Sequence, residues 1–395
     1  MILPLGRKKL WIVIFFPLAL VYLSFILLFL HRHTPFLVSS LSDFMERLAL
    51  VNGGQLVYRD FSFEYPPLFF LVLLIESAAA GLFKFLPYPE SILAIHLFLL
   101  LPIISTIYLI LISGKRVLSA VFLLLLSAPL MGASFDLFAV VLSVAALLLA
   151  SRKRYLFSLF LLSLASGIKI YPLIYLPFIL LWTKSPKLNL KHLVFFSVCV
   201  AAPFVFVISY GGGEGIIGFF RVHLTRGIQN ESVLATPYFL FSELFGSKRE
   251  FYFRNGAYEI SYGSIDWIIG LVGILAFATL YLNLFFKAVR RLFGRVREKI
   301  SQEVIFDLST CLTLFLLVSS KVLSVQFLLW FLLLVPFVSD GLFKKIYLPA
   351  LLVGLLTTVG AGIITYYNQF TVIPIIIRNI LLTFITYSSV KDLKL

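Results

Sequence analysis

Four cationic side chains in this sequence have the type and placement needed to hold an anionic group such as a phosphate. His223 and Arg226 stand three residues apart in a polar segment, and on a helix they would share one face. This spacing sets a planar guanidinium suited to phosphate beside a titratable imidazole, although contact with lipid headgroups is an alternative. Lys169 and Lys321 stand at the edges of apolar stretches, where either an anionic ligand or snorkelling of the side chain explains them.

A second polar segment, 31–65, is dense in charges that alternate with aromatic residues. Within it, 41–51 has helical spacing with an apolar stripe, which predicts a helix lying in the membrane interface. Ser42 is placed to cap the start of that helix, so Asp43 would lie close to the membrane surface. A solvated loop with helix caps is the alternative interpretation of this segment.

Other ionisable residues lie within or beside apolar runs, where such groups are functional candidates by default: Glu76, His96, Asp136 and Asp307. We expect Glu76 to bond across a helix contact and Asp136 to cap a helix. The sequence contains no HExxH, CxxC, GxSxG or Rossmann fingerprint. The run Gly211-Gly212-Gly213 lacks a following Gly-Lys-Ser/Thr, which favours a hinge over a phosphate-binding loop.

The composition requires these residues to be positioned by membrane-spanning helices. Of 395 residues, 61% are hydrophobic and 13% charged, with mean hydropathy +1.04, far from the usage of soluble domains. Since a span needs about 20 apolar residues, roughly twelve helices fit. The net charge of +15 is typical of basic cytoplasmic loops among membrane lipids, so no nucleic-acid partner is expected.

Apolar runs predict an all-α, polytopic bundle forming one integral membrane domain, 1–395. The predicted spans are 10–30, 66–85, 91–112, 117–150, 155–168, 170–182, 192–210, 265–286, 304–320, 324–338, 346–366 and 370–388. The span 117–150 is overlong and broken around 129–135, so the count is twelve or thirteen. If it crosses once, the positive-inside rule places the loops 31–65 and 211–264 outside and 287–303 in the cytoplasm. A double crossing would invert the chain from there to Tyr210.

Four segments together resemble one family. They are Asp43 with Gly53-Gly54, Tyr58 and Tyr65-Pro66-Pro67-Leu68; Gly167 with Lys169-Ile170-Tyr171-Pro172; His223 with Arg226-Gly227-Ile228-Gln229 and Glu231-Ser232; and Lys321-Val322-Leu323-Ser324-Val325-Gln326-Phe327 with Trp330. They are similar to elements of the GT-C membrane mannosyltransferases that use polyprenyl-phosphate sugars, especially glycosyltransferase family 87. Val325 and Phe327 stand where that family usually has proline and tyrosine.

The resemblance implies a GT-C bundle whose two extracytoplasmic loops carry interfacial helices, and an inverting hexosyltransferase, of mannosyltransferase type, in the cell membrane with its active site outside. Its partners would be a polyprenyl-phosphate-sugar donor and a glycan or glycolipid acceptor. The implied roles are a catalytic base (Asp43, with Asp60 and Glu64 as rivals), holders of the donor phosphate (Lys169, Arg226, His223 and Lys321) and substrate contacts (Tyr58, Tyr65, Tyr171, Glu231 and Gln326). No cofactor or metal is obligatory, although Asp43 and Asp60 would bind a divalent cation if they converge.

A transporter or flippase for a lipid-linked sugar is the alternative function, since it also needs many helices and buried charge. Its signature is charge near the bilayer midplane on discontinuous helices. Most notable groups here stand at helix ends, which favours a catalytic pocket, whereas Glu76 and the break near Pro129 keep transport open. A noncatalytic assembly subunit is disfavoured by the two charged loops.

Overall fold

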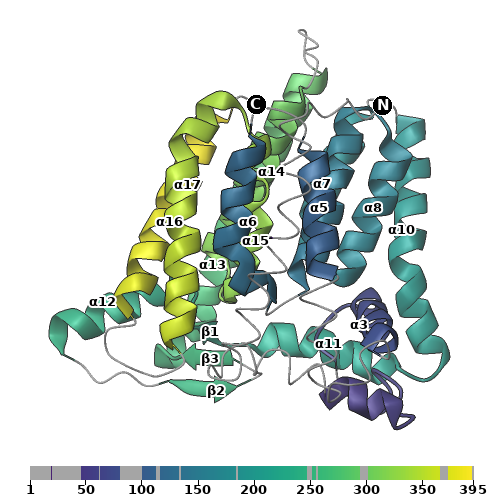
Figure 1. The fold of residues 1–395 in the computed structure, drawn as a ribbon, viewed down its shortest axis with the longest axis horizontal. Helices are drawn as coiled ribbons and strands as arrows, with labels where there is room; N and C mark the ends of the chain where they lie inside the picture. The colour runs from purple at the N-terminus through teal and green to yellow at the C-terminus, as the bar shows by residue number, and fades with distance from the viewer. Residues whose placement is uncertain are drawn as a thin grey trace. The chain divides into compact units, whose positions relative to one another are not determined.

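Helices make up most of the chain in the computed structural model (Figure 1). The structure describes residues 19, 46–61, 63–80, 100–112, 116–132, 135–183, 186–246, 251–254, 257–293, 301–364 and 372–393. Two compact units divide the chain. Unit 1 comprises Met1–Ala146, Leu156–Leu173 and Leu193–Arg221, and unit 2 comprises Leu147–Tyr155, Ile174–His192 and Val222–Leu395.

Five helical segments among the described residues are long and apolar enough to cross a membrane. They are Leu190–Ser209, Gly263–Arg291, Gln302–Ser319, Asp340–Thr358 and Val372–Asp392. Shorter apolar helices accompany them. The prediction of a helical, membrane-embedded protein is therefore confirmed at this level, while the count of twelve or thirteen spans, the GT-C type and the division into loops stay predictions.

Unit 1 contains mainly helices of 11 to 24 residues. They are α3 (Pro67–Ala80), α5 (Leu101–Leu111), α6 (Val117–Gly132) and most of α7 (Asp136–Ser151), α8 (Tyr155–Ile168), α10 (Pro186–Ser209) and α11 (Gly213–Thr225). The last residues of α7 and α11 and the first residues of α8 and α10 belong to unit 2. The predicted overlong span 117–150 forms two separate helices, α6 and α7. The expected break is thus confirmed, and it ends α6 close to the Pro129 position that predicted it.

The predicted glycine hinge forms the turn between α10 and α11. Gly211 has φ +94°, a left-handed conformation that glycine adopts without strain. Two residues into α11, a Cβ on Gly215 would lie 1.9 Å from the main-chain oxygen of Tyr58. The glycines therefore serve a tight turn and a close approach between α11 and the segment that carries Tyr58.

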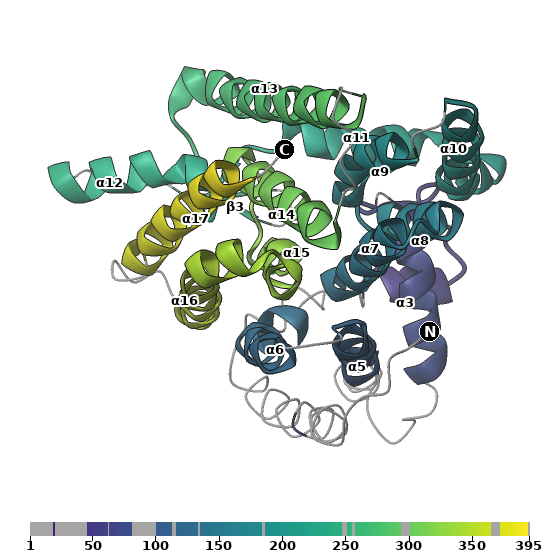
Figure 2. The same ribbon diagram turned by 90° about the horizontal axis from the view of Figure 1, so that it is seen from above.

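Unit 2 is built around three neighbouring helices that Figure 2 shows side by side, α14 (Gln302–Ser319), α16 (Asp340–Ile364) and α17 (Val372–Asp392). Ser301 caps α14, since its Oγ accepts a hydrogen bond from the Val304 amide at 3.3 Å. The other helices are η3 (Tyr171–Tyr175), which begins in unit 1, and α9 (Leu176–Trp182), η4 (Val233–Ala235), α12 (Thr236–Phe245), η5 (Gly263–Ile265), α13 (Asp266–Phe293), η6 (Val325–Leu328), α15 (Leu329–Leu332) and η7 (Val335–Phe337).

A small antiparallel sheet, in the order β1-β3-β2, lies at one end of the unit 2 helices (Figure 1). Its strands are β1 (Ile228–Gln229), β2 (Tyr252–Arg254) and β3 (Ala257–Ile260). Gln229 pairs with Glu259, and Arg254 pairs with Ala257. The sequence analysis did not predict this sheet within 211–264. The signal was present, because Asn255-Gly256 between two aromatic-rich runs is a strong hairpin turn signal.

Candidate functional site

Lys169 of unit 1 lies at the meeting point of three chain segments. Its Nζ is 3.3 Å from Asp136 Oδ1 and 4.3 Å from the ring centroid of Tyr65, and both members of the ion pair are buried. Asp136 begins α7, Lys169 directly follows α8, and Tyr65 precedes α3. These contacts place the first loop and Lys169 at the same end of unit 1, however often 117–150 crosses the membrane.

The structure shows an ion pair for Asp136, whereas the helix capping expected of it stays a prediction. Its carboxylate, in the first turn of α7, is an ion-pair partner of Lys169. The ion pair and the tyrosine ring together fix the position of the ammonium group, and a fixed cation stabilises developing negative charge better than a mobile one. Tyr171, also predicted to contact substrate, is buried at the start of η3.

Two of the three candidate bases of the first loop lie within the described residues, and they are held differently. Asp60 accepts two hydrogen bonds of 2.8 Å from the Arg59 guanidinium and one of 2.7 Å from the Leu56 amide. These bonds lower the pKa of Asp60 to about 2 and make it a weak proton acceptor. Glu64 lies 4.0 Å from Arg47 Nη1, and Asp43 lies outside the described residues.

Tyr58 helps to hold the conformation of the first loop. Its side chain is buried, its φ is +67°, and its hydroxyl donates a hydrogen bond to the main-chain oxygen of Tyr65. Burial raises the pKa of that hydroxyl well above its ordinary value, so it stays a proton donor. The ring of Phe63 packs edge-on against it at 5.8 Å. Tyr58 thus supports the loop that carries the neighbouring acids.

Lys321 of unit 2 is hydrogen-bonded to the second loop at two places. Its Nζ donates to the main-chain oxygen of Leu224 at 3.0 Å, across 97 residues of sequence, and its own main-chain oxygen accepts from the Gln229 amide at 2.9 Å. Ser232 Oγ donates to the adjacent Ser320 oxygen at 2.6 Å. The structure therefore brings together two elements that the sequence analysis singled out separately.

His223 and Arg226 differ in burial, contrary to the shared helix face predicted for them. His223 is exposed in the last turn of α11, whereas Arg226 lies one residue beyond the helix and is buried. The physical reason is that α11 ends at Thr225 and the chain turns into β1.

The element η6 begins with Val325 and Gln326, and a proline would also fit at its start because the first helical positions need no amide donor. Phe327 stacks on Trp330 at 4.2 Å.

Glu259 is a buried acid of unit 2 that the sequence analysis missed. It lies in β3 opposite Gln229, and a Cβ on Gly227 would be 2.5 Å from its Oε2. Its charge raises the pKa of Lys321, although burial has the larger effect and lowers that pKa below the usual value. The glycine of the Arg226-Gly227 pair therefore makes room for a carboxylate beside the lysine.

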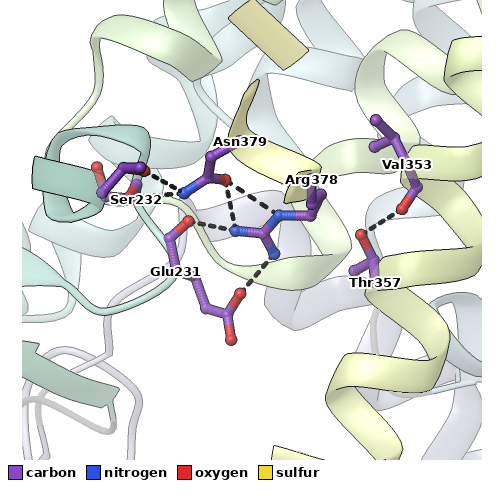
Figure 3. Close-up of polar contacts among 7 residues, drawn as sticks. Glu231, Ser232, Val353, Thr357, Arg378 and Asn379 are labelled. Carbon is purple, nitrogen blue, oxygen red and sulfur yellow. Dashed lines mark hydrogen bonds and ion pairs between the residues drawn. The ribbon is translucent and has the colours of Figure 1, made fainter. Parts of the chain in front are cut away.

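Arg378 is a second missed residue, buried in α17 with 2% of its surface exposed. It pairs with Glu231, and the neighbouring Asn379 bonds to Ser232 and Thr236 (Figure 3). An arginine within the apolar run 370–388 was the available signal, because a charge inside a span marks a functional candidate. Asp307, by contrast, has a local role, accepting a 2.8 Å hydrogen bond from the Ser339 amide.

Two polar clusters result, one in each unit. The first contains Tyr65, Asp136 and Lys169, and the second contains Arg226, Glu231, Glu259, Lys321 and Arg378. Within the part of the chain that the structure describes, no three His, Cys, Asp or Glu residues gather as a metal site would need.

These features define a membrane-embedded helical protein with a buried polar cluster in each unit. No protein-family model, curated protein or solved structure matches the chain.

Proposed function

We propose that this protein is an inverting glycosyltransferase of GT-C type that moves a hexose from a polyprenyl-phosphate donor to an extracytoplasmic glycan or glycolipid. The observation that carries the proposal is the pair of hydrogen bonds joining Lys321 to the 224–229 segment. They gather Arg226 and Lys321, two residues expected to hold the donor phosphate, at one place in unit 2.

The charge of this cluster suits a phosphate. Its described members are three cations and two carboxylates, Arg226, Lys321, Arg378, Glu231 and Glu259, which leaves one positive charge in excess. A buried cation in a site of low dielectric constant stabilises an anion more strongly than one in water. In unit 1, Lys169 supplies a further fixed cation, held by Asp136 and Tyr65.

The chemistry is a displacement at C1 of the donor sugar. The acceptor hydroxyl oxygen forms a bond to C1 as the bond from C1 to the phosphate oxygen breaks, and polyprenyl phosphate leaves. The hydroxyl proton passes to a carboxylate acting as general base. A single attacking step inverts the configuration at C1, whereas retention needs a second carboxylate as nucleophile.

Asp43 is the proposed base. Asp60 is a poor rival, because the guanidinium of Arg59 and the Leu56 amide hold its pKa at about 2. Glu64 lies 4.0 Å from Arg47 Nη1, as a member of a structural ion pair would. Tyr65 and Tyr171 in unit 1, and Glu231 and Gln326 in unit 2, are the proposed substrate contacts.

The test uses the purified full chain in lipid nanodiscs, a radiolabelled short-chain polyprenyl-phosphate mannose and a panel of mannoside acceptors. We expect transfer by the wild type, its loss in Asp43→Asn, and its retention in the matched control Asp60→Asn. Transfer by Asp43→Asn at the wild-type rate would remove Asp43 from the base role. Movement of the labelled lipid across protein-only liposomes, without any transfer, would replace the proposal by a flippase.

A further inference from the structure

Arg378 lies inside α17, a helix long and apolar enough to span the membrane. It is six residues from the start of the helix at Val372, or about 9 Å along its axis. The guanidinium is almost fully buried and donates hydrogen bonds to Glu231 Oε2 and to the main-chain oxygen of Glu231 (Figure 3). One arginine therefore holds both the side chain and the backbone of the same glutamate.

Asn379 fixes the guanidinium in turn. Its Oδ1 accepts hydrogen bonds from Arg378 Nε at 3.1 Å and from Nη2 at 2.8 Å. Its Nδ2 donates to the main-chain oxygen of Ser232 at 3.1 Å and to Thr236 Oγ1 at 2.9 Å. The two adjacent residues of α17 thus bind three positions of the second loop.

The same loop segment is held from its other side by the end of α14 and the residues that follow it. Ser232 Oγ donates to the Ser320 oxygen, and the Gln229 amide donates to the Lys321 oxygen. Glu231 lies between these two attachments. Its position is therefore set by α17 on one side and by the Lys321 segment on the other.

The two oxygens of the Glu231 carboxylate differ in their hydrogen bonding. Oε2 is bound by Arg378, whereas Oε1 accepts no hydrogen bond from the described residues and points away from the guanidinium (Figure 3). The side chain retains 12% exposure. A carboxylate oxygen held in place in this way is a strong acceptor for a hydroxyl group.

We propose that Arg378 is a positioning residue that directs Glu231 Oε1 toward a hydroxyl of the donor sugar, an inference that rests on the proposed function. The sugar is that of the donor because the segment carrying Glu231 also carries Arg226 and is bonded to Lys321, the proposed phosphate holders. Packing alone does not explain the pair, since apolar residues of similar size replace a buried ion pair without loss of stability in many proteins.

The first test measures transfer kinetics for two conservative variants. Arg378→Lys keeps the charge but cannot form the same set of bonds, and Glu231→Gln keeps an acceptor for Arg378 but removes the anionic oxygen. Both should raise KM for the donor about tenfold to a hundredfold, as loss of a charged hydrogen bond does, with a smaller change in kcat. Thr357→Val removes a buried hydroxyl bonded to the Val353 oxygen of neighbouring α16 and is the matched control with unchanged KM.

A double variant, Arg378→Met with Glu231→Met, separates positioning from folding. We expect it to fold, because neither charge is left unpaired, and to keep the raised KM for the donor. Wild-type KM in the double variant would overturn the proposal, since Glu231 would then have no contact with the sugar. A lower yield of active protein with unchanged KM in Arg378→Lys would assign the Arg378–Glu231 pair a structural role, and this result would also overturn the proposal.

Binding without transfer tests the inference apart from the proposed function. The probes are short-chain polyprenyl-phosphate mannose and the same polyprenyl phosphate without sugar. Glu231→Gln should weaken binding of the first by about tenfold to a hundredfold and leave binding of the second unchanged. If the wild type binds the sugar donor but transfers nothing, the proposed function fails and the positioning role stands. Equal losses for both probes, or no binding of the sugar donor by the wild type, would overturn the inference.

Discussion

Removing the charge of Asp136 is expected to destabilise unit 1 strongly, because it leaves the ammonium of Lys169 buried without that ion pair. The two charges are 3.3 Å apart, and the side chains of Lys169 and Asp136 are 9% and 1% exposed. Breaking such a pair by changing one member costs about 3–5 kcal/mol. The Tyr65 ring, 4.3 Å from the ammonium, returns about 0.5–2 kcal/mol. For Asp136→Asn we therefore expect a loss of about 1–4.5 kcal/mol in the free energy of unfolding.

A double-mutant cycle measures this coupling directly. Lys169→Met alone should cost about as much as Asp136→Asn, whereas the double variant should lie within about 1 kcal/mol of the wild type because no charge is left unpaired. The assay is reversible unfolding of the full chain in mixed micelles with added denaturing detergent. Additive losses in the double variant would show that the two groups do not interact. Sugar transfer should stay low in the double variant, since the proposed phosphate cation is gone.

Gly215→Ala should cost at least about 2 kcal/mol, because its Cβ would lie 1.9 Å from a main-chain oxygen, whereas Gly218→Ala has open space; equal melting temperatures would contradict this. Asp60 has its pKa lowered from 3.8 to about 2, so its stabilisation is full above about pH 4 and is lost as pH falls through 2. Asp60→Asn should flatten the melting temperature over that acid range, and an unchanged slope would refute the pairing. Burial lowers the pKa of Lys321 below 10.5, so transfer activity should begin to fall before the rising pH reaches 10.5. Lys321→Arg should move this alkaline limb of the pH–activity profile upward, and an unmoved limb would exclude Lys321 as its cause.

Apolar periodicity predicted the helices well, since a membrane span is recorded in one continuous run of sequence. The run 304–320 became α14, 370–388 became α17, and the break near Pro129 separates α6 from α7. The small sheet was missed because the Asn255-Gly256 turn signal is short and lies inside a loop judged only by its charges. Local patterns of this kind could have been recognised before the structure was known.

The pairings within each cluster could not be predicted in the same way. Lys321 and Leu224 are 97 residues apart, and Arg378 and Glu231 are 147 residues apart. Side-chain type made Lys169 and Asp136 candidates, but only the tertiary structure shows that they form an ion pair. Pairing of this kind depends on tertiary distances, which no single segment records.

Arg378 also has a consequence for how the protein enters the membrane. An arginine within a membrane-spanning helix costs at most about 2.5–3.5 kcal/mol on insertion, the value for the helix centre, and the many isoleucines and leucines of α17 offset this cost. Its partner Glu231 is 147 residues earlier in the chain, so the ribosome makes the segment that carries this glutamate first. The counter-ion of Arg378 is thus synthesised before α17, and pairing with it offsets part of the cost of placing a charge within this helix.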